Sequence, residues 1–309
     1  MSFAVAARAE GLRVATWHGD FSRKGPGLLF QDIVAGQVPL GPILDASPDV
    51  LLLTDMDYDG GLTALSALRD ALREAGLDLP HVLAARPNTG RPTGLDLDGD
   101  GRLGGPRDAQ GFGYFNGQGG MAVLARYPLT LERDLSELLW KDAPESLIAA
   151  DDPGHDVQRL STAAHWQVTV DTPHGPLALL TLAATPPVFD GPEDRNGRRN
   201  FDEAVLWLHV LNGRMDEVPQ MPVILLGNLN VDPERGDGLR EAARRVLGHD
   251  RLQDPIPGSD TVRWDSTGPM RVSYVLPDAR FAVIGAGVTG PAADAGPHGL
   301  VWVDLAWPR

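Results

Sequence analysis

The segment PVILLGNLNVDP, residues 222–233, places polar side chains directly after an apolar run. A turn that holds Asn228, Asn230 and Asp232 follows the last apolar residue of the run. Oxygen-bearing side chains at a strand end can hold a divalent cation or orient a phosphate. Asn228, however, carries an amide where a carboxylate would be the stronger metal ligand or base. The segment therefore predicts either an active site or the scaffold of a former one.

Other apolar runs of this chain also end in side chains that could do chemistry. They supply His18, Asp55 and Asp57, Ser273, and His298 just before the run LVWVDL. Strand ends that converge on one rim of a sheet form a site. The alternative is that each of these residues is a loop residue beside a strand, without a shared site.

Hydrophobic periodicity indicates which elements position these residues. Short apolar runs predict strands at 12–17, 49–56, 120–129, 165–172, 177–185, 222–230, 271–277, 281–288 and 300–307. Helical spacing of leucines predicts helices within 60–76 and 198–213, and shorter ones within 27–37 and 236–248. Many strands with few helices favour two packed sheets with helices outside. We expect one domain over 11–309, a flexible N-terminus at 1–10, and loop insertions at about 85–120 and 131–160, the second acidic and irregular.

The order of these segments resembles the endonuclease/exonuclease/phosphatase superfamily, which shares the fold of DNase I. The segments that carry the resemblance are LRVATWHGDFSR, PDVLLLTDMDYDG, the stretch 86–129, TPPVFDGPEDRNGRRN, PVILLGNLNVDP, RVSYVLP and HGLVWVDL. The likeness is greatest to a bacterial, often exported subgroup. It implies a four-layer α/β/β/α sandwich of two packed, mainly antiparallel sheets. It also implies metal-assisted attack of water on a phosphate ester.

The same resemblance shows where the chain departs from the family pattern. Asn230 and His298 are retained. The replaced positions carry His18 for Asn, Asp55 for the metal-binding Glu, Ala183 for His, Asn228 and Ser273 for Asp, and Gly296-Pro297 for Ser-Asp. An amide cannot accept a proton from water, and deleting one donor to a developing negative charge costs about 10²–10³ in rate. Losing the carboxylate behind a histidine costs up to about 10⁴ in other enzymes.

These departures predict a catalytically inactive or strongly impaired relative. The family positions His298, Asn230, Asn228 and His18 are the candidate catalytic residues, and Asp55 is the candidate site for Mg²⁺ or Mn²⁺. The alternative is an active metal-dependent phosphoesterase that hydrolyses phosphate-ester small molecules with a rearranged set: His18, Asp55, Asp57 and His298. The histidines would favour a transition metal over Mg²⁺.

A second candidate metal site lies in GLDLDGDGRLGG. Asp96, Asp98 and Asp100 alternate and a glycine follows them, as at the start of a calcium loop. The twelfth position holds Arg107 instead of a bidentate Glu, so the segment is not an EF-hand. Asp108 or a backbone carbonyl could complete a different cage for Ca²⁺. The alternative is a solvated Asp/Gly turn paired with nearby arginines.

The one basic cluster is FDGPEDRNGRRN. Arg195 and Arg198 could clamp a phosphate, and the alternative is an ion-pair network that pins a long loop.

Composition limits the partners and the compartment. The net charge of −15 and the missing basic stripe argue against duplex nucleic acid. With no cysteine, disulfides and thiolate chemistry are excluded, and no apolar run is long enough for a transmembrane helix. Residues 1–10 carry an Ala-x-Ala pattern without a complete signal peptide. The resemblance favours a periplasmic or secreted protein, with the cytoplasm as the alternative. The biological partner and the oligomeric state stay open.

Overall fold

Strands from both ends of the chain meet at the centre of the first sheet. The computed structural model describes residues 11–215, 217–290 and 295–307, so the predicted flexible N-terminus (1–10) lies outside the described residues. Within them the first sheet has the order β12 (Ala282–Thr289), β13 (Leu300–Ala306), β1 (Leu12–Phe21), β2 (Val50–Met56), β4 (Gly120–Ala125) and β3 (His81–Leu83). Only the β1–β2 pair is parallel among these neighbours.

The second sheet repeats this arrangement with one parallel pair. In the described part of the chain its order is β11 (Ser273–Pro277), β8 (Val223–Asn228), β7 (Gly175–Ala183), β6 (His165–Thr172) and β5 (Leu129–Asp134). The β7–β8 pair is parallel and the other neighbours are antiparallel. The predicted sandwich of two mainly antiparallel sheets is therefore confirmed.

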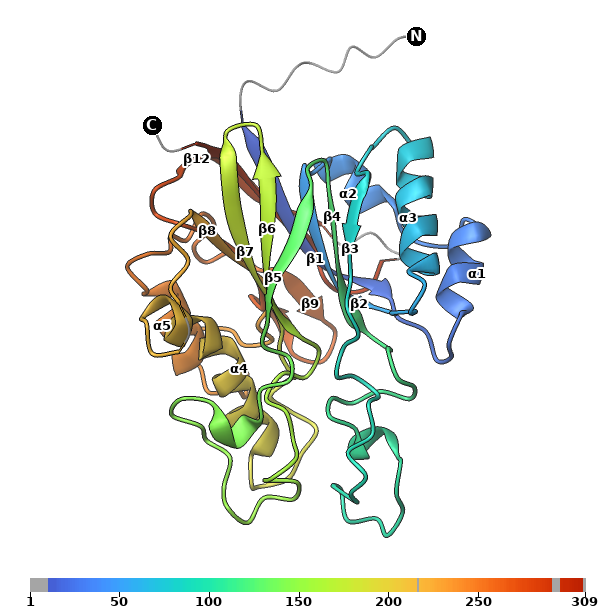
Figure 1. The fold of residues 1–309 in the computed structure, drawn as a ribbon, viewed down its shortest axis with the longest axis vertical. Coiled ribbons are helices and arrows are strands. Elements are labelled where there is room, and N and C mark those ends of the chain that lie inside the picture. The colour runs from blue at the N-terminus through green and yellow to red at the C-terminus, as the bar shows by residue number, and fades with distance from the viewer. Residues whose placement is uncertain (1–10, 216, 291–294, 308–309) are drawn as a thin grey trace.

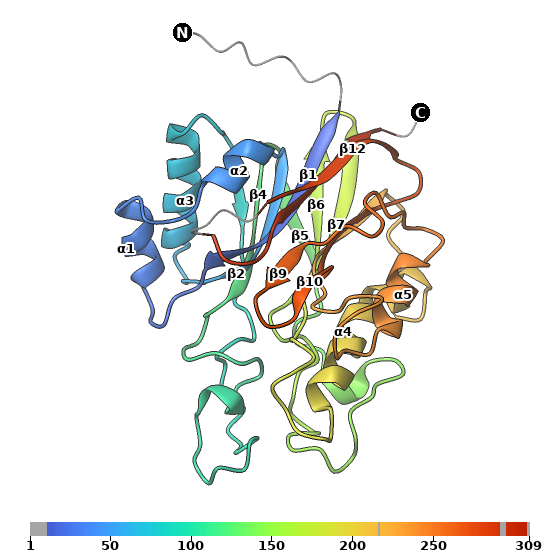
Figure 2. The same cartoon turned by 180° about the vertical axis from the view of Figure 1, so that it is seen from behind.

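Helices cover the outer face of each sheet, as Figures 1 and 2 show from opposite sides. On the first sheet lie α1 (Leu28–Val34), α2 (Gly41–Ala46) and α3 (Thr63–Glu74), and on the second lie α4 (Arg195–Leu211) and α5 (Glu241–Leu247). In α3 the predicted stripe is buried at Leu65, Leu68 and Leu72. Of the helices, α2 was not predicted from the sequence, because its six residues form less than two full turns.

Three apolar cores hold the four layers together. The central core lies between the sheets and includes Val14, Val123, Trp166 and Ile224, all fully buried. Of the two outer cores, one lies between the first sheet and its helices and the other between the second sheet and its helices. Strands buried on both faces have no polar alternation, which is why β2, β4 and β8 appear in the sequence as continuous apolar runs.

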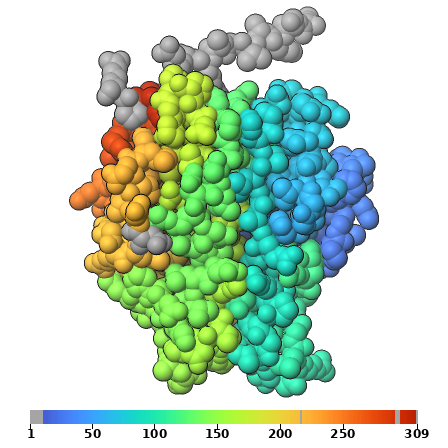
Figure 3. All heavy atoms as spheres, in the orientation of Figure 1, coloured from blue at the N-terminus to red at the C-terminus, as the bar shows by residue number. Residues whose placement is uncertain are grey.

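Long loops project from the end of the sandwich opposite the β6–β7 turn, and Figure 3 shows them as two lobes at the base of the molecule. The loop segment predicted as irregular, 131–159, differs in two respects. Its first residues continue strand β5 to Asp134, and Trp140 in the short 3₁₀ turn Trp140–Asp142 is fully buried with Leu160 against α4. A second 3₁₀ turn covers Pro106–Asp108, and a hairpin of β9 (Val262–Trp264) and β10 (Gly268–Met270) was not predicted. In the described residues, no helix has the length and apolar character needed to cross a bilayer.

Candidate active site

Three of the predicted site positions lie side by side at the rim of the second sheet. Ala183 at the end of β7 pairs in register with Asn228 at the end of β8, and Asn228 pairs with Ser273 at the start of β11. All three are buried. The register places a methyl, an amide and a hydroxyl in one row at this rim.

The rim of the first sheet contributes a second group. His18 in β1 and Thr54 in β2 are register partners, and Asp55 follows Thr54. His298 lies two residues before the first residue of β13, and its backbone oxygen accepts a hydrogen bond of 3.0 Å from the indole of Trp17. The rings of His18 and His298 are 4.5 Å apart between centroids. This hydrogen bond and the ring contact hold the two imidazoles together.

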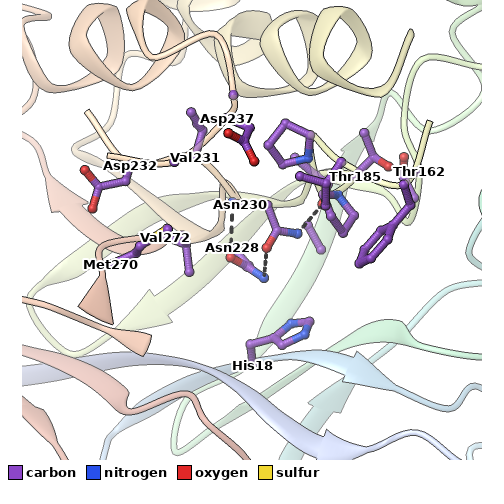
Figure 4. Close-up of a pocket in the computed structure, with 18 of the residues that line it drawn as sticks. His18, Thr162, Thr185, Asn228, Asn230, Val231, Asp232, Asp237, Met270 and Val272 are labelled. Carbon is purple, nitrogen blue, oxygen red and sulfur yellow. Dashed lines mark hydrogen bonds between the residues drawn. The ribbon is translucent and has the colours of Figure 1, made fainter. Parts of the chain in front are cut away.

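The two rims face each other across a cleft of about 630 Å³. His18, Asp55, Ala183, Asn228, Asn230 and His298 all line it, and Figure 4 shows His18 pointing toward the amides of Asn228 and Asn230. Asp57 does not line this cleft; its carboxylate accepts hydrogen bonds from the backbone nitrogens of Arg23 and Gly119. Most of the predicted strand ends therefore converge on this cleft, whereas Asp57 and Ser273 do not line it.

The two amides of this cleft hydrogen-bond each other. Asn228 Nδ2 donates to Asn230 Oδ1 over 3.1 Å, and the backbone nitrogen of Asn230 donates to Asn228 Oδ1 over 3.2 Å (Figure 4). Asn230 Nδ2 donates to the oxygen of Ala184 over 2.7 Å. Asn230 reaches this position with a left-handed backbone (φ 54°), which Asn tolerates better than most residues. The pair is therefore closed on itself, and neither amide can act as a base.

Both imidazoles are neutral over the physiological pH range. Burial lowers the pKa of His18 to about 4, and burial with the neighbouring His18 lowers the pKa of His298 to about 2. Nδ1 of His18 lies 3.0 Å from the hydroxyl of Thr54. Nδ1 of His298 is buried, and no group among the described residues hydrogen-bonds it. A carboxylate at that atom would raise the basicity of His298, but the preceding residue is Pro297.

Asp55 is a carboxylate without a partner. Its backbone is left-handed (φ 61°), at a point where the β1–β2 and β2–β4 registers shift. Burial, followed by repulsion from Asp57 and Asp20, raises the pKa of Asp55 to about 7. The positive charge of Arg23 partly offsets this rise, but its guanidinium is paired with Asp32 and Asp20. Over residues 11–215, 217–290 and 295–307, nothing hydrogen-bonds or ion-pairs with the Asp55 carboxylate.

These donors fit Mg²⁺ or Mn²⁺ poorly. Mg²⁺ requires octahedral oxygen ligands and is held through carboxylates. Asp55 is half protonated near pH 7, and His18 offers a neutral nitrogen. The cleft residues that the structure describes include no group of three His, Asp or Glu ligand atoms close enough to share one ion. The described residues of this cleft therefore do not form a suitable site for Mg²⁺ or Mn²⁺.

The only described residues that could hold a metal as a group of three lie elsewhere. Asp96, Asp98 and Asp108 each place one carboxylate oxygen within 4.8 Å of the others. Asp108 is the residue considered as a completing ligand, but Asp100 is not part of the cluster. Asp100 instead accepts a hydrogen bond of 2.8 Å from the backbone nitrogen of Arg102. The grouping of Asp96, Asp98 and Asp100 is corrected accordingly: the chain reversal before Asp108 determines which carboxylates meet.

Arg195 and Arg198 do not line the cleft. Arg198 forms an ion pair of 2.7 Å with Asp152 and donates to the oxygen of Leu147. Arg195 donates to the oxygen of Pro153 over 2.6 Å and to Gln158 Oε1. These contacts tie the N-terminus of α4 to the 147–158 loop, in agreement with the ion-pair alternative. Phosphate binding by the two arginines stays a prediction.

Sequence reasoning missed the residues that hold the loops around the cleft. Glu203 in α4 is fully buried and accepts hydrogen bonds from the backbone nitrogens of Thr162 and Thr185, which both line the cleft. Burial raises its pKa to about 7. Trp264 in the β9–β10 hairpin stands edge-on to His298, 5.5 Å away between centroids. Glu203 lies on a face of α4 away from the apolar stripe, so the hydrophobic periodicity of the sequence gave no sign that it is buried.

Two packed sheets with helices outside, and polar residues gathered where central strands end, define an α/β sandwich of the DNase I type. A model of the Endonuclease/Exonuclease/phosphatase family matches residues 29–303. The chain therefore belongs to the endonuclease/exonuclease/phosphatase family.

Solved structures agree on this fold. The chain is similar to an endonuclease/exonuclease/phosphatase from Beutenbergia cavernae (20% identity, 97% of this chain and 72% of that one, TM-score 0.61). It is also similar to the human Nocturnin catalytic domain with bound sulfate (14%, 96% and 94%, TM-score 0.54). A third is sphingomyelinase C from Streptomyces griseocarneus (14%, 96% and 99%, TM-score 0.51). At these identities the likeness concerns the fold. A search of curated proteins finds no match.

Proposed function

We propose that this chain is a catalytically inactive member of its family, whose cleft no longer hydrolyses phosphate esters. The observation that carries the proposal is the buried, unpartnered Nδ1 of His298 next to Pro297. An imidazole with a strongly lowered pKa and no acid behind it is a weak base, and near neutral pH almost none of it is in the protonated form that acts as a general acid.

The opposite rim supports the same conclusion. Activating water requires a general base, such as an imidazole or a carboxylate, or a metal ion that lowers the pKa of the water. The row Ala183, Asn228 and Ser273 supplies neither, and the Asn228–Asn230 pair is closed on itself. The effects of catalytic residues that act together are not additive, so the losses of rate expected at the individual positions do not multiply into one factor.

The test is an assay of the purified protein on phosphomonoesters and phosphodiesters with Mg²⁺, Mn²⁺ and Ca²⁺, beside Asp55→Ala as control. We expect the two proteins to give the same background rate. Turnover that Asp55→Ala abolishes would overturn the proposal. A combined variant that installs Ala183→His, Asn228→Asp, Ser273→Asp and Pro297→Asp, shown by circular dichroism to be folded, is expected to gain activity.

The second candidate function is an active phosphoesterase with a rearranged site. The observation that favours it is that His18, Asp55 and His298 share one cleft with the retained Asn230. This candidate requires a cation on Asp55. It predicts that calorimetry detects Mg²⁺ or Mn²⁺ binding which Asp55→Asn removes; no heat from either metal at millimolar concentration would exclude it.

We also propose that Asp96, Asp98 and Asp108 bind Ca²⁺. Three carboxylate oxygens within reach of one ion form a hard-cation donor set, and Asp98 and Asp96 lie on a loop with access to solvent. Asp98→Asn is expected to weaken Ca²⁺ binding measured by calorimetry. Asp100→Asn, the matched change outside the cluster, is expected to leave it unchanged. Equal losses in the two variants would contradict this cluster.

A further inference from the structure

The charges that line the cleft are unsuited to an anion. Arg235 is the one cation lining it in the described part of the chain, and it is paired with Asp232 over 3.0 Å and with Asp260 over 2.6 Å. Asp55 and Asp237 also line the cleft, and neither forms an ion pair with any described residue. A phosphate entering this space would meet two uncompensated carboxylates and no free positive charge.

The walls of the same cleft are mainly apolar and include three aromatic rings. Phe112 and Phe189 line it while 55% and 78% of their surface is exposed, so neither ring is placed there by burial in a core. Trp264 closes the cleft beside His298. Aromatic rings that line a concave space offer flat apolar surface on which the body of a small organic ligand can pack.

From this geometry we propose that the cleft binds an organic amine: an ammonium group paired with Asp55 and an apolar body packed on Phe112, Phe189 and Trp264. The volume of about 630 Å³ lies within the range of small-molecule sites, about 300–1,000 Å³. The cation compensates a carboxylate that has no partner among the described residues, and the net charge of −15 attracts cations to the surface. This inference rests on the proposed function, because a working phosphoesterase would need the same Asp55 for a metal.

Three ligands with one phenyl ring and different charges test the proposal: 2-phenylethylamine, 2-phenylethanol and phenyl phosphate. Calorimetry with EDTA present, at low salt and pH 8, measures binding without any metal. We expect the amine to bind at least about tenfold more tightly than the alcohol, as a charge-assisted hydrogen bond in a partly buried site allows, and phenyl phosphate not to bind.

Variants separate the charge from the walls. Asp55→Asn, which keeps the shape of the side chain, is expected to reduce amine binding to the level of the alcohol. Asp265→Asn, the same change at an exposed residue beside the cleft, is expected to keep the preference. Phe189→Ala, at an exposed position, is expected to weaken the amine and the alcohol by similar factors.

Three results would overturn the inference: equal binding of amine and alcohol, tighter binding of phenyl phosphate, or a preference that survives Asp55→Asn. No binding of any of the three ligands at millimolar concentration would also overturn it. The calorimetry is done without metal and measures binding, whereas the turnover assays measure hydrolysis. A negative result for amine binding is therefore distinguishable from a failure of the proposed function.

Discussion

Replacing Asp55 by Asn should stabilise the protein, and by an amount that grows with pH. The pKa of Asp55 is raised from 3.8 to about 7 in the folded state. Below pH 3.8 the carboxyl is protonated whether the chain is folded or unfolded. Between pH 3.8 and about pH 7, Asp55 loses its proton in the unfolded chain but keeps it in the folded chain. The free energy of unfolding therefore falls until about pH 7 and is then constant.

The size of the effect follows from the width of the window. Each pKa unit corresponds to about 1.4 kcal/mol, so between pH 5 and pH 8 the wild type should lose at most about 2.7 kcal/mol relative to Asp55→Asn. Partial access of solvent to Asp55 reduces this value, and about 1.5–2.5 kcal/mol is the working expectation. Asn also tolerates the left-handed backbone at this position. Other groups whose pKa is raised, such as Glu203, titrate equally in wild type and Asp55→Asn, so their contributions cancel in the difference in stability between the two proteins.

The assay is urea unfolding of wild type and Asp55→Asn, followed by tryptophan fluorescence at pH 5, 6, 7 and 8. Asp265→Asn serves as the control for removing one negative charge from an acidic surface. A gap between wild type and Asp55→Asn that does not change with pH, or a variant less stable than wild type at pH 8, would refute the conclusion that Asp55 is buried without a partner.

Further predictions concern the strands behind the cleft. Gly227→Ala should cost more than about 3 kcal/mol, because an added Cβ would lie 1.9 Å from the oxygen of Leu182 at a φ of 141°; loss of soluble, cooperatively unfolding protein checks this. Tyr274→Phe should cost about 1–2 kcal/mol in urea unfolding, since its buried hydroxyl lies within 2.9 Å of two backbone oxygens and can donate to either. Asp278→Asn should cost about 2 kcal/mol at pH 7. Burial acts to raise its pKa, but hydrogen bonds and ion pairs with Arg280 and Arg251 outweigh burial and lower the pKa to about 2. The stability from this carboxylate is therefore present above pH 3.8 and lost toward pH 2, where the variant and wild type should converge in thermal unfolding.

The sequence was sufficient to predict that several strand ends lie close together. Continuous apolar runs indicate central strands buried on both faces, and the polar residue after each run must lie at the rim. His18, Asp55 and Asn228 were found in this way, and the structure places all three in one cleft. The register that puts Ser273 opposite Asn228 follows from strand pairing and has no local signal.

The sequence did not predict contacts that depend on how the loops fold back on themselves and on the helices. The acidic loop motif gave Asp96, Asp98 and Asp100 by their alternation, yet loop closure brings Asp108 to the cluster instead. In α4 the periodic stripe indicated one buried face, but Glu203 on another face is also buried, because the loops at Thr162 and Thr185 fold over it. Neither contact has a periodicity that a reader of the sequence could detect.

The hydrogen-bonded pair Asn228–Asn230 makes a single substitution to a carboxylate at this rim costly. If Asn228 alone became Asp, an anionic oxygen would stand about where Nδ2 now faces Asn230 Oδ1, 3.1 Å away. Asn230 could not rotate its amide to relieve this repulsion without giving up its bond to the oxygen of Ala184. A change to Asp at position 228 alone is therefore expected to destabilise this rim, and a carboxylate would fit there only if Asn230 changed with it.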